Sequence, residues 1–140
     1  MYSAVDVANF VIAHENVKSR PITNLRLGKL LYFIQADFLV NKGFPCFKED
    51  VIAWDSGPVV LEAYSEFKIY GGLQIPRWDD NKVAKIREED CGTISEMLDR
   101  LDNYSTRKLD EIIKAAKPYI RGRLRFKGKI TNESLEEYYG

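Results

Sequence analysis

Residues 54–59 read Trp54-Asp55-Ser56-Gly57-Pro58-Val59, and they place a large aromatic directly before the strongest breakers of regular structure. The run that begins at Asp50 and leads into this stretch favours a strand of roughly two to four residues or an extended segment. We expect Pro58 to take the first position of the following helix, where its missing N–H does no harm. The stretch therefore predicts a shaped surface held between helices and not a catalytic loop.

The preceding segment predicts a long helix. Its apolar residues recur at spacings of three and four, which is one helical stripe: Leu27, Leu30, Leu31, Ile34 and Phe38. Thr23 is the expected N-cap, and Gly43 is the expected left-handed residue after the last turn. Gly28 lies inside the stripe, and we interpret it as the site of a close contact between two helices.

Further helices are predicted on both sides of this centre. Ser3 caps a helix that runs to about residue 16, and Asp90 or Thr93 caps another. Ser105 begins the next helix, which Pro118 is expected to stop. With a short closing helix near 132–138, the fold class is mainly α (α+β with minor β). We expect one domain over residues 1–140, a compact bundle of about five to six helices with a short β hairpin or small sheet.

Charged residues alternate with apolar or glycine residues near the C-terminus. The cations are Arg121, Arg123, Arg125, Lys127 and Lys129. A period of two predicts a strand or hairpin with one cationic face. Three interpretations remain open: phosphate contacts with nucleic acid, an edge strand whose charges prevent aggregation, and a docking face for an acidic protein.

The composition narrows the classes of protein that fit this sequence. Among the 140 residues, 21 are Lys or Arg and 21 are Asp or Glu, so net charge indicates no particular partner. Cys46 and Cys91 show neither zinc-ligand nor disulfide-framework spacing, and we interpret them as buried or half-buried thiols. No apolar run is long enough to span a membrane and no leader pattern opens the chain, so we expect a cytoplasmic protein.

The catalytic candidates are few. A Ser-His-Asp or Cys-His enzyme would have to use His14, since it is the one histidine. The acidic clusters Asp79-Asp80 and Glu88-Glu89-Asp90 could serve metal binding or acid–base chemistry, but they occur in polar stretches where solvated side chains are expected. No phosphate-binding loop or nucleophile elbow occurs. We therefore predict that the protein is not an enzyme and needs no cofactor or metal.

Three stretches, taken in this order and spacing, carry a resemblance to a known family. They are Pro21-Ile22-Thr23-Asn24-Leu25-Arg26-Leu27-Gly28-Lys29-Leu30-Leu31-Tyr32-Phe33, then Ile52-Ala53-Trp54-Asp55-Ser56-Gly57-Pro58-Val59-Val60, then Tyr64-Ser65-Glu66-Phe67-Lys68-Ile69-Tyr70-Gly71. Together they resemble the Panacea domain, also called the SocA-like antitoxin domain. The resemblance is best over residues 3–72, and 130–139 is similar to the family's closing helix. Residues 73–129 diverge from the family pattern.

The resemblance implies a mostly helical, non-catalytic domain that binds and neutralises a toxin encoded beside it, often in a prophage. One branch of that family delivers the toxin to an ATP-dependent protease, which would be a second partner. We expect the partner-binding residues to be Trp54, Gly57, Pro58, Val59 and Tyr64, although a core position for Trp54 is the alternative. Arg121, Arg123, Arg125 and Lys127 are a secondary candidate surface. The alternative function is a nucleic-acid-binding regulator that uses the basic segment 117–129.

Overall fold

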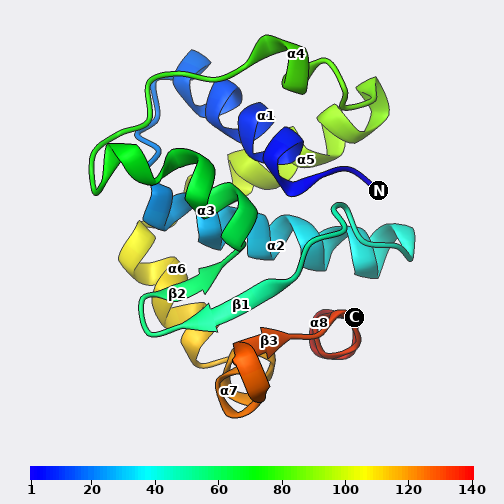
Figure 1. Cartoon of the computed structure of the whole chain (residues 1–140). Coiled ribbons are helices and arrows are strands. Elements are labelled where there is room, and N and C mark those ends of the chain that lie inside the picture. Colours follow the sequence, from blue (N-terminus) through cyan, green and yellow to red (C-terminus); the bar gives the residue numbers. More distant parts are fainter.

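The computed structural model describes residues 1–140 and is mainly helical, with a small antiparallel sheet (Figure 1). Its α-helices are α1 (Ala4–Val17), α2 (Asn24–Lys42), α3 (Leu61–Phe67), α4 (Asp80–Val83), α5 (Glu88–Leu101), α6 (Thr106–Lys114), α7 (Lys117–Leu124) and α8 (Asn132–Tyr139). The strands are β1 (Val51–Trp54), β2 (Gly57–Val59) and β3 (Lys129–Ile130), and short 3₁₀ helices are η1 (Lys68–Tyr70) and η2 (Phe126–Gly128). The mainly α fold class with minor β is confirmed, with more short helices than expected.

Helix α2 crosses the centre of the molecule (Figure 1). In that view α1, α4 and α5 lie on one side of it, and the sheet, α7 and α8 lie on the other. Thirteen of its nineteen residues are buried, so it is enclosed on all sides and not only along one stripe. The connected apolar core extends from Ala4 in α1 to Leu135 in α8.

Most of the predicted helix ends are confirmed. The side chain of Thr23 accepts a hydrogen bond from the Arg26 amide at 3.2 Å, and Gly43 ends α2 with φ of 80°. Ser3 and Ser105 cap α1 and α6 in the same way. The predicted cap of α5 is wrong, because this helix begins at Glu88 without a side-chain cap.

Asp90, which was predicted to cap α5, instead makes contacts with other parts of the chain. Asp90 is buried and accepts a hydrogen bond from Lys42 Nζ at 2.5 Å and another from the Tyr2 hydroxyl. These bonds hold the pKa of Asp90 below its usual value although burial alone would raise it. The carboxylate therefore joins the N-terminus, the end of α2 and the start of α5.

The sheet has the order β2-β1-β3, and both pairs are antiparallel. Trp54 pairs with Gly57 across the β1–β2 turn, and Ala53 pairs with Pro58. The expectation that Pro58 opens a helix is wrong, because Pro58 lies in the edge strand β2 and α3 begins at Leu61. A proline at an edge position leaves no required ladder bond unmade.

The predicted cationic strand or hairpin at 119–130 is also wrong. Pro118 lies in the first turn of α7 and starts this helix, where we expected it to end the preceding one. Only Lys129 and Ile130 form a strand, and the turn before it places Lys127 at φ 62° and Gly128 at φ 70°. The alternation failed as a strand signal because Leu124, like most of the apolar members, points into solvent.

The two cysteines are free thiols, with Cys46 buried and Cys91 half-buried, as expected. No helix combines the length and the mean hydropathy that crossing a membrane requires.

Gly28 makes a close contact, but with a strand and not with a second helix. A Cβ atom at Gly28 would lie 2.3 Å from the carbonyl oxygen of Pro58. Because that oxygen belongs to the backbone of β2, no side-chain rotation can relieve the overlap. Gly28 therefore sets how closely the hairpin lies on α2.

We predict that Gly28→Ala lowers the free energy of unfolding by about 1–3 kcal/mol, since strand β2 must move away from α2. The matched control is Gly92→Ala in α5, where an added Cβ meets nothing within 4 Å. That change is expected to raise stability by up to about 1 kcal/mol through helix propensity. Urea unfolding followed by circular dichroism measures both, and a Gly28→Ala variant as stable as the parent would contradict the argument.

Candidate protein-interaction surface

The β1–β2 turn is held by a buried lysine of α2. Lys29 is 1% exposed, and its Nζ donates to the carbonyl oxygen of Ser56 at 3.1 Å. It also lies 3.4 Å from Oδ1 of Asp110 in α6, an ion pair, and Asp110 Oδ2 pairs with Lys114 at 3.0 Å. Burial lowers the pKa of Lys29, and the Asp110 carboxylate offsets part of that effect. The turn therefore depends on a cation that water barely reaches.

Helix α7 holds the same hairpin from a second direction. The hydroxyl of Tyr119 donates to the carbonyl oxygen of Trp54. Arg123 Nη1 donates to the Ala53 carbonyl at 3.1 Å, and its Nη2 pairs with Asp55. Burial raises the pKa of Tyr119, so the phenol stays protonated as a donor. The hairpin is thus tied to α2, α6 and α7 together.

Trp54 and Tyr64 form an aromatic pair on this rigid support. Their ring centroids are 5.1 Å apart with an interplanar angle of 73°, and both residues are half-buried. The Asn24 side-chain amide donates to the Tyr64 carbonyl at 3.0 Å, which fixes α3 to α2. An edge-to-face pair of this kind offers rigid apolar area at little cost in side-chain entropy.

The other three candidate partner-binding residues are buried. Gly57, Pro58 and Val59 face α2 and α6, and the φ of Gly57 is +118°. A Cβ at Gly57 would lie 2.8 Å from Lys29 Nζ, so this position favours glycine both for its backbone and for its space. These residues shape the turn, while the exposed parts of Trp54 and Tyr64 are what a partner could touch.

The structure does not bring the basic candidates together on one face. Arg121 lines a hollow between α7 and α8 with Lys117 and Glu137. Arg123 is bound to the hairpin, and Arg125 Nη1 donates to the Lys129 carbonyl at 3.3 Å. Lys127 projects from the turn at η2 and forms no ion pair within this chain.

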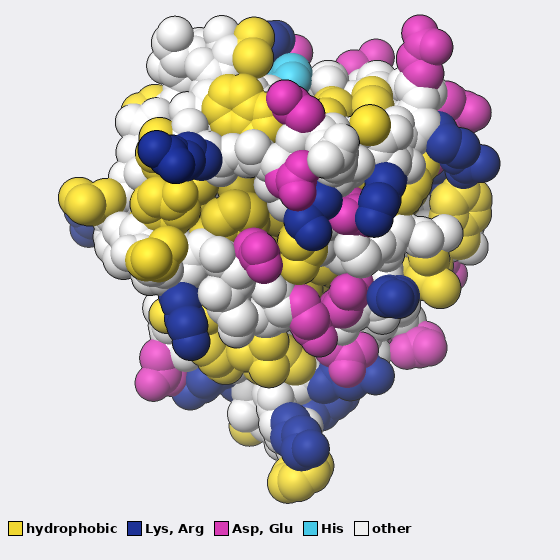
Figure 2. All heavy atoms as spheres, turned by 45° about the horizontal axis from the view of Figure 1, so that its top comes forward, with side chains coloured by type: hydrophobic (Ala, Val, Ile, Leu, Met, Phe, Trp, Pro, Cys, Tyr) yellow, Lys and Arg dark blue, Asp and Glu magenta, His cyan; other side chains and the backbone are white.

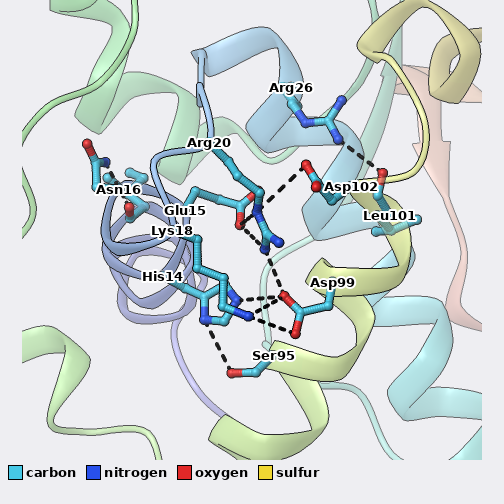
Figure 3. A network of polar contacts seen from close by, with 11 residues as sticks. His14, Glu15, Asn16, Lys18, Arg20, Arg26, Ser95, Asp99, Leu101 and Asp102 are labelled. Carbon is cyan, nitrogen blue, oxygen red and sulfur yellow. Dashed lines mark hydrogen bonds and ion pairs between the residues drawn. The ribbon is translucent and has the colours of Figure 1, made fainter.

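His14 belongs to a polar network between α1 and α5 (Figure 3). The Asp99 carboxylate is 3.2 Å from His14 Nε2 and accepts from Lys18 at 2.9 Å and from Arg20 at 3.0 Å. These bonds hold the pKa of Asp99 well below its usual value. Arg20 also pairs with the buried Glu15 at 2.6 Å. The single histidine, cyan in Figure 2, reaches the surface beside acidic side chains.

Ser95 Oγ lies 3.5 Å from His14 Nδ1, so a Ser-His-Asp sequence of contacts is present in outline. The serine contact is at the limit of a hydrogen bond, and Asp99 is shared with two permanent cations. None of the five main surface hollows includes His14, Ser95 or Asp99. The network joins the end of α1 and the turn that follows it to α5.

The sequence analysis missed the residues that hold the hairpin. Lys29 gave no usable signal, because it lies on the helix face opposite the apolar stripe, where a solvated lysine is expected. Tyr119 and Asp110 gave none, because each is defined only by where α6 and α7 pack. The residues that hold the hairpin are therefore evident only in the folded structure.

The fold and the surface together define a mainly α domain that displays an aromatic pair on a small sheet. The family model described as Antitoxin SocA-like, Panacea domain, matches residues 27–124, and the chain belongs to this family. The match includes most of the stretch 73–129, which its motifs alone did not place in the family. Membership supports an antitoxin role and suggests a non-enzymatic one.

One curated relative is Antitoxin SocA of Caulobacter vibrioides (strain NA1000 / CB15N). The two are 38% identical over 79 residues, which is 56% of this chain and 40% of the relative. The chain therefore matches less than half of that protein's length. No solved structure matches the chain significantly.

We predict that Lys29→Met lowers the free energy of unfolding by about 1–3 kcal/mol, because the Ser56 carbonyl loses its donor. The matched control is Lys114→Met, which removes the exposed partner of the same Asp110 carboxylate. Its effect should stay within about 0.5 kcal/mol. Chemical denaturation of both variants is the measurement, and equal losses would show that burial of Lys29 is not what matters.

Proposed function

We propose that this protein is an antitoxin that neutralises a cognate protein toxin by direct, stoichiometric contact. The observation that carries the proposal is family membership together with the aromatic pair Trp54–Tyr64 on a hairpin tied to three helices. Rigid aromatics lose little entropy on binding and are common energetic centres of protein interfaces. The toxin would contact the exposed parts of Trp54 and Tyr64, and the buried Gly57, Pro58 and Val59 would hold their geometry.

Two mechanisms fit direct contact. The antitoxin blocks the toxin for as long as the complex lasts, or it delivers the toxin to an ATP-dependent protease. They differ in the lifetime of the toxin, which coexpression leaves unchanged in the first case and shortens in the second. We further propose that the chain acts in the cytoplasm as one domain and is encoded beside its toxin on a prophage or other mobile element.

A nucleic-acid-binding regulator is the weaker alternative. The segment 117–129 carries many cations, yet Arg123 and Arg125 are bound to the chain itself and Arg121 points toward α8. Phosphate recognition needs several free cations along one track. An affinity for DNA or RNA that falls steeply as the salt concentration rises would support this alternative.

Coexpression with the products of the flanking genes tests the proposal. We expect one neighbour to inhibit growth alone, to be tolerated with this protein, and to copurify with it in stoichiometric amount. Trp54→Ala should weaken that complex roughly 30-fold, the equivalent of about 2 kcal/mol. If no neighbour is both inhibitory and bound, the proposal fails.

The matched control is Trp78→Ala, because Trp78 is also half-buried but packs near α4, where its Nε1 donates to Asp80 at 2.9 Å. It should leave the affinity within about twofold. If thermal unfolding shows that Trp54→Ala is unstable, the affinity of Tyr64→Ala provides a second test of the same surface. Equal losses from Trp54→Ala and Trp78→Ala would place the interface elsewhere.

A further inference from the structure

The aromatic pair is one end of a longer apolar strip. On β1, Ile52 and Trp54 are half-buried while their neighbours Val51 and Ala53 are buried, so the first two share the outer face. Leu61, which is 44% exposed, and Tyr64 are three residues apart on α3 and also share a face. The strip therefore continues from Tyr64 and Trp54 to Ile52 and Leu61.

A groove extends the strip to the turn at η2. It is lined by the apolar side chains of Ile52, Leu61 and Phe126 and by the charged side chains of Asp50, Glu62, Lys127 and Lys129. Lys129 pairs with Asp50 at 3.4 Å, whereas Lys127 and Glu62 form no ion pair in this chain. Lys127 Nζ lies 5.5 Å from the centroid of the Phe126 ring. One cation and one carboxylate of the groove are therefore free to form ion pairs with a partner.

The side chain of Phe126 lies in solvent and does not pack into the core. It is 87% exposed, and the next two residues both have positive φ, which folds the chain into a tight turn closed by a bond from the Gly128 amide to the Arg125 carbonyl. Gly128 lies against Ala53 and Ile52, so β1 supports the turn from below. A lysine at positive φ is uncommon, and such backbone persists where surrounding structure holds it. Leu124, 84% exposed, adds apolar area beside it.

Charge is unevenly distributed although the net charge is zero. Residues 105–129 contain nine Lys or Arg and two acidic residues, and the rest of the chain contains twelve and nineteen. The turn at η2 therefore belongs to the most basic segment of the chain. A partner surface with carboxylates around an apolar pocket would complement it.

We propose that the strip ending at Phe126 is the docking surface for the toxin, and that the toxin presents an apolar pocket rimmed by Asp and Glu. Phe126 enters the pocket, Lys127 faces the acidic rim, and the Trp54–Tyr64 pair covers the other end of the contact. The inference rests on the proposed antitoxin function and adds the chemistry of the partner.

The groove favours a protein over a nucleic acid. Asp50 and Glu62 lie in it, and Asp55, 92% exposed at its side chain, stands at the hairpin turn. Phosphates would meet these carboxylates, whereas a protein surface can match mixed charges. Leu61 and Leu124 offer aliphatic area that suits an apolar pocket.

The test uses the full chain and the growth-inhibitory neighbour that copurifies with it. Phe126→Ala and Lys127→Glu should each weaken the complex at least about tenfold, and the Lys127→Glu loss should shrink at high salt. The matched controls are Ile69→Ala and Lys68→Glu, because that pair is exposed on the other 3₁₀ helix, η1, with Ile69 at 86%. The controls should leave affinity within about twofold. A photoreactive benzoylphenylalanine in place of Phe126 should crosslink to a toxin segment rich in apolar and acidic residues.

The outcomes separate the two claims. If the toxin binds and responds to Trp54→Ala but not to Phe126→Ala or Lys127→Glu, the inference is overturned and the antitoxin function stands. A crosslink to a basic segment, or losses seen only in nucleic-acid binding, would also overturn it. If no neighbour is toxic and bound, both claims fall together.

Discussion

The fold depends on satisfying the polar side chains that α2 buries. Because this helix is enclosed on all sides, its polar groups cannot reach bulk water, and each left unpaired would cost about 1–3 kcal/mol. Four of them instead bind the backbone of four different segments. Asn24 donates to Tyr64 O at 3.0 Å, Arg26 to Leu101 O at 3.1 Å, Lys29 to Ser56 O at 3.1 Å, and Gln35 to Phe47 O at 2.9 Å.

These bonds give the three motif stretches one physical explanation. The first stretch supplies the donors and the close-contact residue Gly28, the second is the hairpin, and the third is α3 with η1. The second and third stretches follow one another closely in the chain, and both pack against α2, so their joint occurrence with the first is a packing constraint. The motif therefore specifies a scaffold more than it specifies a binding site.

The helix ends that depend only on neighbouring residues were predicted correctly from the sequence. Thr23, Gly43 and Ser105 begin or end helices as expected, because a cap involves only its own turn of backbone. The conformation of Pro58 and of residues 119–130 depends on contacts with residues that are distant in the sequence. Pro58 is extended because its carbonyl lies against Gly28, and the charged alternation became α7 because Gly122 fits against Ile130 and Ala53. The turn at η2 that exposes Phe126 was likewise not predicted, because a period of two indicates a strand.

The way the hairpin is held depends little on its outward side chains. Its fixing bonds end on backbone oxygens, those of Ala53, Trp54 and Ser56, and the donors come from Arg123, Tyr119 and Lys29. A backbone carbonyl is present whatever the side chain is, so the outward residues of β1 and α3 can change without disturbing the bonds beneath them. The bonds that hold the hairpin thus come from the donors beneath it and from the close approach at Gly28, and under the proposed function recognition would fall to the outward side chains. Such a division of roles would let a binding module keep one fold while the surface that it displays changes.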